Sequence, residues 1–244
     1  MRAVITLFRK ETASFLNSLI AYIVMTVFLI GTGIFFWVFN DNVLDTGAAE
    51  LTILFMMGPW LFLFLIPAIT MRSFAEEMRN GTLDLLFSRP LSGKQIIAGK
   101  YMAACGLVLF SILPTLVYFA SIWYLGNPPG NLDTGAAIGA YIGLCFLGFT
   151  FAAIGIFTST LTGNQIVAFI LAVFFCFTFY TGFDFIADLP GVSAFNEQII
   201  QIGMIEHYRS ISRGVIDSRD LLYFVSISFI FLMLSDLNLS LRRK

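Results

Sequence analysis

Six long apolar runs constrain this chain more than any other feature of its sequence. They cover residues 19–39, 51–70, 101–124, 135–158, 166–186 and 221–241. About 20 consecutive apolar residues, wound as a helix, cross the hydrocarbon core of a bilayer. A helix also satisfies its backbone hydrogen bonds internally, which lipid requires. The sequence therefore predicts an all-α polytopic membrane protein with six transmembrane helices.

The composition supports the same class of protein. The chain is 58% hydrophobic and 12% charged, whereas soluble domains carry about 25% charged residues. Six spans of about 20 residues leave no room for a second folded unit, so we expect a single transmembrane domain over residues 1–244. The three cysteines lie within apolar runs and are expected to be small buried hydrophobic residues. These are Cys105, Cys145 and Cys176.

The basic residues predict the orientation of the spans. Eleven of the fourteen Lys and Arg residues lie in the N-terminal tail, the loop after the second run and the C-terminal tail. By the positive-inside rule, both termini and this central loop face the cytoplasm. Residues 1–18 repeat apolar residues at helical spacing among charged ones, which indicates an amphipathic helix in the membrane interface.

The central loop, residues 72–100, is the longest charged interruption between two spans. Asn80 and Gly81 predict a helix end within it, because glycine takes the left-handed C′ conformation without strain. Ser92 and Gln95 form a capping-box pattern that starts the helix entering the third span. The loop is thus expected to begin and end as helical extensions of the spans on either side.

Between these extensions the sequence predicts a short helix with an unpartnered apolar face. Thr82 can cap it, Pro90 ends it, and Leu83, Leu86 and Phe87 form the face. An exposed apolar patch with a charged rim is typical of an interface with another protein; packing on the chain's own N-terminal helix is the alternative. The residues predicted to make the contact are Glu76, Glu77, Arg79, Gly81, Thr82, Leu83, Leu86, Phe87 and Pro90.

Small residues in the fourth run predict close helix packing. Gly148, Ala152 and Gly155 recur at i, i+4 and i+7, and such ridges let helices approach closely in lipid. They pack either within the chain or against a second copy. Residues 187–220 contain too few apolar positions to span a bilayer, so we expect two short half-inserted helices there, on the outer side.

No pattern in the sequence predicts an enzyme or a bound cofactor. Gly93-Lys94 lacks the earlier glycine and the following Ser or Thr of a phosphate-binding loop, and no catalytic constellation appears. His207, the single histidine, has no orienting partner in sight and is expected to be a polar surface residue. Asp236 is either a functional intramembrane carboxylate or a snorkelling residue beside Arg242.

A motif in the central loop carries a family resemblance. It reads Glu77-x-x-x-Gly81-Thr82-Leu83-x-x-Leu86-x-x-x-Pro90-Leu91-Ser92 and ends at Gly99-Lys100-Tyr101. This motif resembles the core of the ABC-2 type permeases, the membrane subunits of bacterial ABC exporters. Residues 17–23, 64–72 and 207–217 are similar in particular to the gliding-motility-associated permease of Bacteroidota.

The resemblance implies a partner arrangement. It implies a bacterial inner-membrane permease, a separate cytoplasmic ATPase that binds ATP and docks on residues 72–100, and two permease chains per transporter, identical or not. It implies no nucleic acid and does not supply a substrate or a direction. The alternative function is a non-transporting membrane scaffold that anchors a motility or secretion complex.

Overall fold

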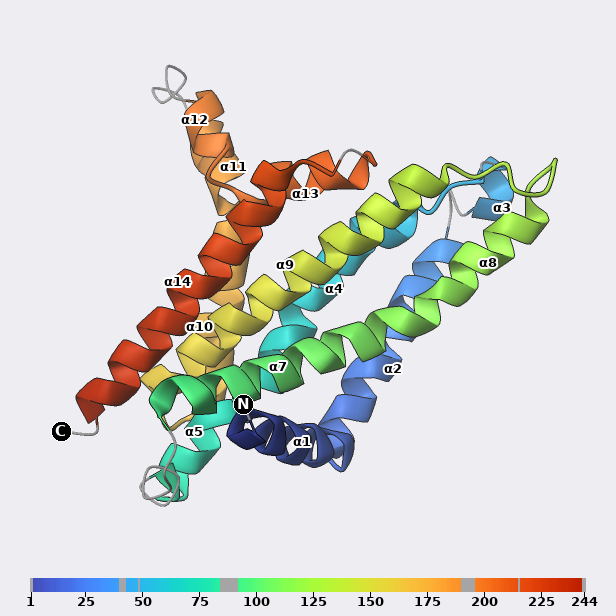
Figure 1. The fold of residues 1–244 in the computed structure, drawn as a ribbon. Coiled ribbons are helices and arrows are strands. Elements are labelled where there is room, and N and C mark those ends of the chain that lie inside the picture. Colours follow the sequence, from blue (N-terminus) through green and yellow to red (C-terminus); the bar gives the residue numbers. More distant parts are fainter. Residues whose placement is uncertain are drawn as a thin grey trace.

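The computed structural model describes residues 2–39, 43–47, 49–83, 92–189, 196–214 and 216–242, and these residues form helices joined by short connections (Figure 1). Six helical stretches are long and apolar enough to cross a membrane, as predicted. They are Leu19–Trp37, Thr52–Arg79, Gly93–Leu125, Thr134–Leu161, Gln165–Ala187 and Ser218–Arg242. The all-α polytopic architecture is therefore confirmed.

The individual elements divide these stretches further. In chain order they are α1 (Arg2–Leu16), α2 (Leu19–Trp37), α3 (Val43–Thr46), α4 (Thr52–Thr70), α5 (Arg72–Arg79), α7 (Gly93–Ile112), η1 (Leu113–Thr115), α8 (Leu116–Leu125), α9 (Thr134–Leu161), α10 (Gln165–Phe177), η2 (Thr178–Gly182), α11 (Phe183–Ala187), α12 (Asn196–Ile200), α13 (Met204–Ser212) and α14 (Ser218–Arg242).

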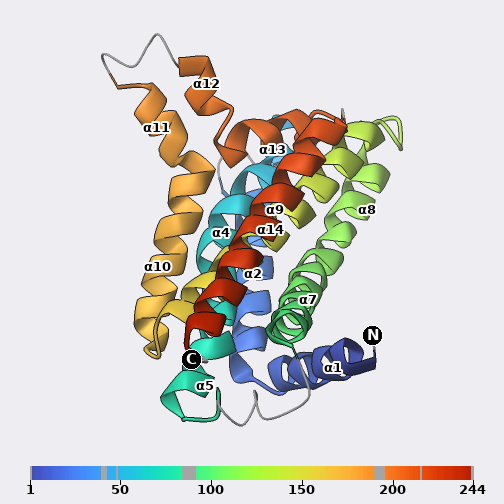
Figure 2. The ribbon, with the colours of Figure 1, turned by 60° about the vertical axis from the view of Figure 1, so that its left-hand side comes forward.

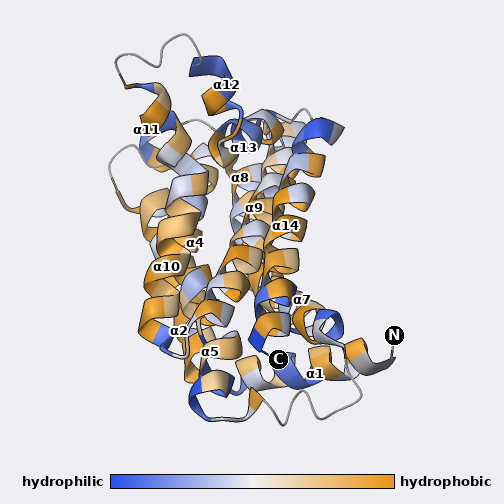
Figure 3. Ribbon diagram, turned by 90° about the vertical axis from the view of Figure 1, so that its left-hand side faces the viewer, coloured by the Kyte–Doolittle hydropathy of each residue, from blue (hydrophilic) through white to orange (hydrophobic). Residues whose placement is uncertain are grey.

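The spans lie side by side, with α1 across one end of the bundle and α13 across the other (Figure 2). α11 and α12 project beyond the end that carries α13. Colouring by hydropathy shows an apolar belt around the middle of the bundle and hydrophilic residues at both ends (Figure 3). This banding is what a bilayer-spanning protein requires.

Two spans depart from straight α-helix, and a proline accounts for the first departure. The third begins at Gly93, eight residues before the predicted boundary, because Ser92 and Gln95 form both hydrogen bonds of the predicted capping box. It narrows to the 3₁₀ turn η1 around Pro114, whose nitrogen carries no hydrogen for an α-helical bond. The fifth span widens to a π-helical turn at η2.

α9 lies at the centre of the bundle and packs against α4, α7, α10, α13 and α14. Its small residues allow this packing. A Cβ at Gly148 would lie 2.6 Å from Val108 Cγ1, and one at Gly155 would overlap the Thr70 hydroxyl. Ala152 between them is fully buried. The predicted ridge therefore faces other helices of the same chain.

Shorter helices lie at the two ends of the bundle. The N-terminal segment forms α1, as predicted, and Leu7 packs it against α7 at Gly99, where a Cβ would lie 2.9 Å from Leu7 Cδ2. Residues 196–212 form the short helices α12 and α13, and α13 rests on α9. Their depth of insertion in a bilayer remains a prediction.

Candidate functional site

The end of α5 has the backbone geometry that its sequence predicts. Gly81 has φ +66°, and its N–H donates to the Met78 carbonyl over 3.3 Å. The Thr82 N–H donates to the Glu77 carbonyl over 2.9 Å, and the Thr82 hydroxyl donates to the same oxygen. These two backbone bonds define a Schellman motif. The motif confirms the helix stop at Asn80 and fixes the direction in which the chain leaves α5.

The other predicted docking residues differ in their exposure. Glu76 and Arg79 are exposed on α5, where a partner can reach them. Leu83, expected to lie open on an apolar face, is instead buried at 9% exposure in the main hydrophobic core, so the expectation that it has no partner within the chain was wrong. Three further members, Leu86, Phe87 and Pro90, lie outside the described residues.

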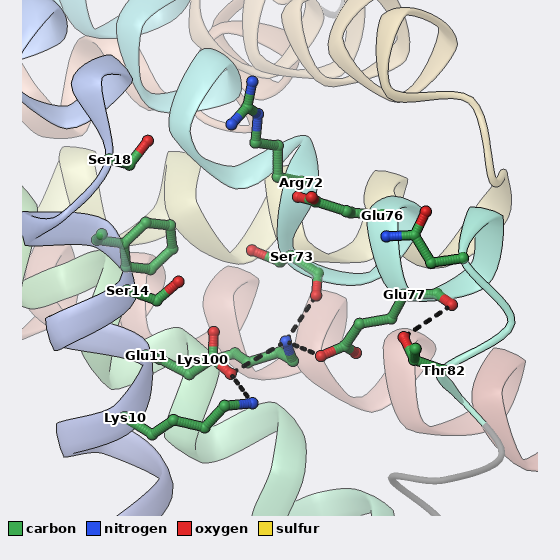
Figure 4. Close-up of a pocket in the computed structure, with 12 residues that line it drawn as sticks. Lys10, Glu11, Ser14, Ser18, Arg72, Ser73, Glu76, Glu77, Thr82 and Lys100 are labelled. Atoms are coloured by element: carbon green, nitrogen blue, oxygen red, sulfur yellow. Dashed lines mark hydrogen bonds and ion pairs between the residues drawn. The ribbon is translucent and has the colours of Figure 1, made fainter.

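Glu77 turns away from the surface and takes part in a buried charge cluster around Lys100 (Figure 4). The Lys100 side chain is 2% exposed. Its ammonium donates to the Ser73 carbonyl oxygen over 2.7 Å and to Glu77 Oε1 over 2.8 Å, and lies 3.4 Å from Glu11 Oε1. Three N–H donors thus meet three acceptors, which satisfies the ammonium group completely.

The cluster also uses an aromatic ring. Lys100 Nζ lies 5.0 Å from the centroid of the Phe74 ring, within the range of a cation–π interaction. Phe74 is fully buried, so water does not screen this contact. We refer to Glu11, Ser73, Phe74, Glu77 and Lys100 as the Lys100 cluster.

The Lys100 cluster borders a polar cavity of about 510 Å³ between α1, α5 and α7. Lys10 lies at the cavity and its ammonium is 3.5 Å from Glu11 Oε1. The cavity wall also includes Arg72 and Glu76, and Figure 4 shows the Arg72 guanidinium pointing away from Lys100. A polar cavity of this size can hold water.

The Lys100 cluster joins three helices of the chain. One ammonium on the third span binds α1 through Glu11 and α5 through Ser73 and Glu77. α5 follows the second span after a single residue, Met71. The Lys100 cluster therefore connects α5, and with it the second span, directly to the third span and to α1.

Sequence reasoning placed Lys100 among the charges of the loop and missed this cluster. Glu11 and Lys100 are 89 positions apart, and Ser73 and Lys100 are 27 apart. Ser73 contributes a backbone carbonyl, which no residue pattern reveals. The available signal was that uncharged residues flank Lys100 on both sides, at 96–99 and from 101 on, since a lysine buried among such residues almost always has a partner.

His207 has partners that the sequence did not reveal. Its Nδ1 lies 2.7 Å from Asp220 Oδ1, its Nε2 lies 2.9 Å from the Gln201 carbonyl oxygen, and its ring stacks on Tyr223 at 3.9 Å. The expectation that this histidine lacks an orienting partner was therefore wrong. His207 connects α13 to the start of α14 and to the residue after α12.

Asp236 lies at the opposite end of α14. A Cβ at Gly93 would be 2.7 Å from Asp236 Oδ1, so the carboxylate lies against the first residue of α7. A negative charge is favourable at a helix N-terminus. Arg242, the expected neighbour, donates to the Leu161 carbonyl over 2.7 Å, and Asn238 donates to the Thr160 carbonyl.

These features define a multi-pass membrane protein in which a buried charge cluster joins the helix after the second span to the third span and to α1. Residues 5–212 match the profile of the family described as "ABC-2 family transporter protein". The chain belongs to this family. Members are membrane subunits of transporters, are not themselves catalytic, and normally work with an ATPase subunit.

Curated relatives agree with this assignment. Over 147 residues the chain is 25% identical to the "Probable multidrug ABC transporter permease YbhR" of Escherichia coli (strain K12) and to the protein of the same name in Escherichia coli O157:H7. The alignment covers 60% of this chain and 38% of each relative. The chain thus spans well under half the length of these relatives.

Proposed function

We propose that this chain is the permease subunit of an ATP-driven exporter in a bacterial inner membrane and that residues 72–100 couple it to a separate cytoplasmic ATPase. The observation that carries the proposal is the Lys100 cluster. It ties the loop helix α5 to the third span and to α1, so a displacement of the loop moves transmembrane helices. The resemblance to the gliding-motility-associated permease supports a role in motility or secretion.

The position of α5 supports a contact with a partner. Glu76 and Arg79 are exposed on it, and exposed charges at a rim mainly set orientation and specificity. The sequence pattern predicts that the apolar residues Leu86 and Phe87 of the loop contact the partner. Both termini share this end of the bundle (Figure 2), and the positive-inside rule, applied to the basic residues of the sequence, supports a cytoplasmic location for this end.

Leu86→Asp tests the coupling contact. A carboxylate introduced into a desolvated interface costs several kcal/mol when it has no partner, so we expect the variant to insert and fold while losing the co-purifying ATPase. Leu189→Asp is the matched control, because Leu189 is 54% exposed beyond the opposite end of the bundle. Wild-type ATPase stoichiometry in Leu86→Asp would show that the loop is not the docking element.

A membrane scaffold is the second candidate function, and one measurement separates it from transport. In a permease, ATP turnover by the partner moves α5, and with it α1 and α7, relative to the rest of the bundle. Spin labels at exposed positions on α5 and α14, such as Arg79 and Leu241, should report a nucleotide-dependent change in distance. A constant distance with and without nucleotide would favour the scaffold.

A further inference from the structure

A second cavity, of about 850 Å³, lies at the end of the bundle away from the termini. Parts of α4, α9, η2 and α13 line it. Its volume is within the range of about 300–1,000 Å³ that is usual for small-molecule sites. Neither the family assignment nor the Lys100 cluster gives this cavity a role.

One wall of the cavity is aromatic and apolar. Phe55, Met56, Trp60 and Tyr180 contribute to it, and the Trp60 and Tyr180 rings meet edge to face at 5.8 Å. The wall is held in place by Tyr208, whose hydroxyl donates to the Phe55 carbonyl over 2.7 Å. Burial raises the pKa of Tyr208 well above its ordinary value, so this donor stays protonated. The apolar wall is therefore preformed.

The other side of the cavity carries charges, and nearly all have partners. Glu50 accepts a hydrogen bond from the Thr52 hydroxyl over 3.0 Å. Asp133 caps α9 by accepting from the Ala136 N–H over 2.9 Å. Glu206 lies 3.8 Å from an Arg213 nitrogen.

Arg209 is the exception among the described charges of this cavity. It is exposed and forms no ion pair within 4.0 Å with any acid of the described ranges. Asp184 acts on it electrostatically from beyond that distance. The unpaired charge at the cavity is thus a guanidinium, and this group binds carboxylates and phosphates through two parallel hydrogen bonds.

We infer that this cavity binds an amphiphile with a single anionic head group, the head at Arg209 and the apolar body on Phe55, Met56, Trp60 and Tyr180. The inference rests on the proposed transport function, because it names the substrate class for that function. A carboxylate or phosphate head fits equally. An anionic phospholipid of the bilayer and a single-chain amphiphile share this chemistry, and the test separates them.

Trp60 supplies the reporter for the test. The chain has three tryptophans, so replacing Trp37 and Trp123 with phenylalanine leaves Trp60 as the single fluorophore. Dibromostearate, a brominated anionic amphiphile, quenches tryptophan on contact. In phosphatidylcholine nanodiscs we expect saturable quenching of Trp60, whereas the methyl ester of the same acid, which lacks the charge, should bind about tenfold more weakly.

Two variants test the charge. Arg209→Gln should weaken dibromostearate binding by about tenfold and leave binding of the methyl ester unchanged. Arg219→Gln, a matched change at an exposed arginine outside the cavity, should leave both unchanged. Quenching that does not saturate, or an equal affinity in Arg209→Gln and Arg219→Gln, would overturn the inference.

A charge series at Met56 keeps the inference testable if Arg209→Gln folds poorly. Met56 lines the cavity and is 62% exposed, so a charged side chain can be accommodated there. Met56→Lys should tighten dibromostearate binding and Met56→Asp should weaken it. Equal affinities of the two variants for dibromostearate would contradict a site for an anionic head group.

Nanodiscs that contain phosphatidylglycerol distinguish the two occupants. Competition by phosphatidylglycerol identifies a bilayer lipid as the ligand, and undiminished dibromostearate binding identifies a single-chain amphiphile. All these measurements use the permease without its ATPase. If dibromostearate does not bind but α5 still moves with nucleotide, only this site is refuted. If dibromostearate binds but α5 does not move with nucleotide, only the coupling proposal is refuted.

Discussion

The substitution Lys100→Met separates the charge of the Lys100 cluster from its packing. Methionine keeps a long unbranched apolar stem beside Phe74 and removes the ammonium that Ser73, Glu77 and Glu11 share. Volume is nearly retained, so a cavity contributes little to the change in stability. The change in stability of the variant then measures the contribution of the buried charge.

The expected loss follows from the acceptors that remain. Removing one partner of a buried ion pair typically costs about 3–5 kcal/mol. The Glu77 and Glu11 side chains are 19% and 11% exposed and reach the polar cavity, where water can hydrate them. Glu11 also keeps Lys10 at 3.5 Å. We therefore expect a loss of about 2–3 kcal/mol, below the range for a fully buried pair.

Thermal unfolding of the purified chain measures this loss. For a chain of this size, 1 kcal/mol shifts the midpoint by about 2–4 °C, so Lys100→Met should unfold about 4–12 °C below wild type. Lys94→Met is the matched control, since Lys94 is an exposed lysine on the same helix. The control should unfold within about 2 °C of wild type, because surface substitutions change stability by under about 0.5 kcal/mol.

A double-mutant cycle identifies Glu77 as the group left uncompensated. Glu77→Gln removes the carboxylate that depends on Lys100, so Lys100→Met combined with Glu77→Gln should lose at least about 1 kcal/mol less than the sum of the single variants. Additive losses of stability in the double variant would refute the ion-pair reasoning, as would an unfolding midpoint of Lys100→Met equal to that of Lys94→Met. Either result would mean that the cluster contributes to stability only through packing.

Three further predictions follow from the fold. Replacing His207 with alanine leaves the buried Asp220 carboxylate without its nitrogen donor and should cost about 1–3 kcal/mol; calorimetry that shows no loss would argue against the contact. Gly155→Ala should overpack α9 against Thr70 and lower the free energy of unfolding by about 1–3 kcal/mol; a calorimetric result equal to wild type would show that α4 can shift away from α9. In a chain lacking native cysteines, a cysteine at Lys94 should react with membrane-impermeant maleimide only in inverted vesicles and one at Asn131 only in intact cells; the opposite pattern would reverse the topology.

The sequence by itself determined the elements of this protein. Length and hydropathy predict the six spans, because a bilayer demands an apolar helix of fixed length wherever the chain crosses it; the second and third helical stretches extend eight or nine residues further into the central loop than predicted. Local signals also sufficed for the helix stop at Gly81 and the capping box at Ser92, since both depend on residues within a few positions. The loop motif of the ABC-2 family is likewise a continuous pattern.

Only the tertiary structure decided how these elements meet. The pairing of Lys100 with Glu11 and a Ser73 carbonyl, the His207–Asp220 contact and the burial of Leu83 join positions far apart in the chain or involve backbone atoms. The sequence shows that a buried lysine needs acceptors but not which ones the packing of α1, α5 and α7 brings within reach. For the same reason, the unpaired state of Arg209 became visible only after the neighbouring acids had been placed.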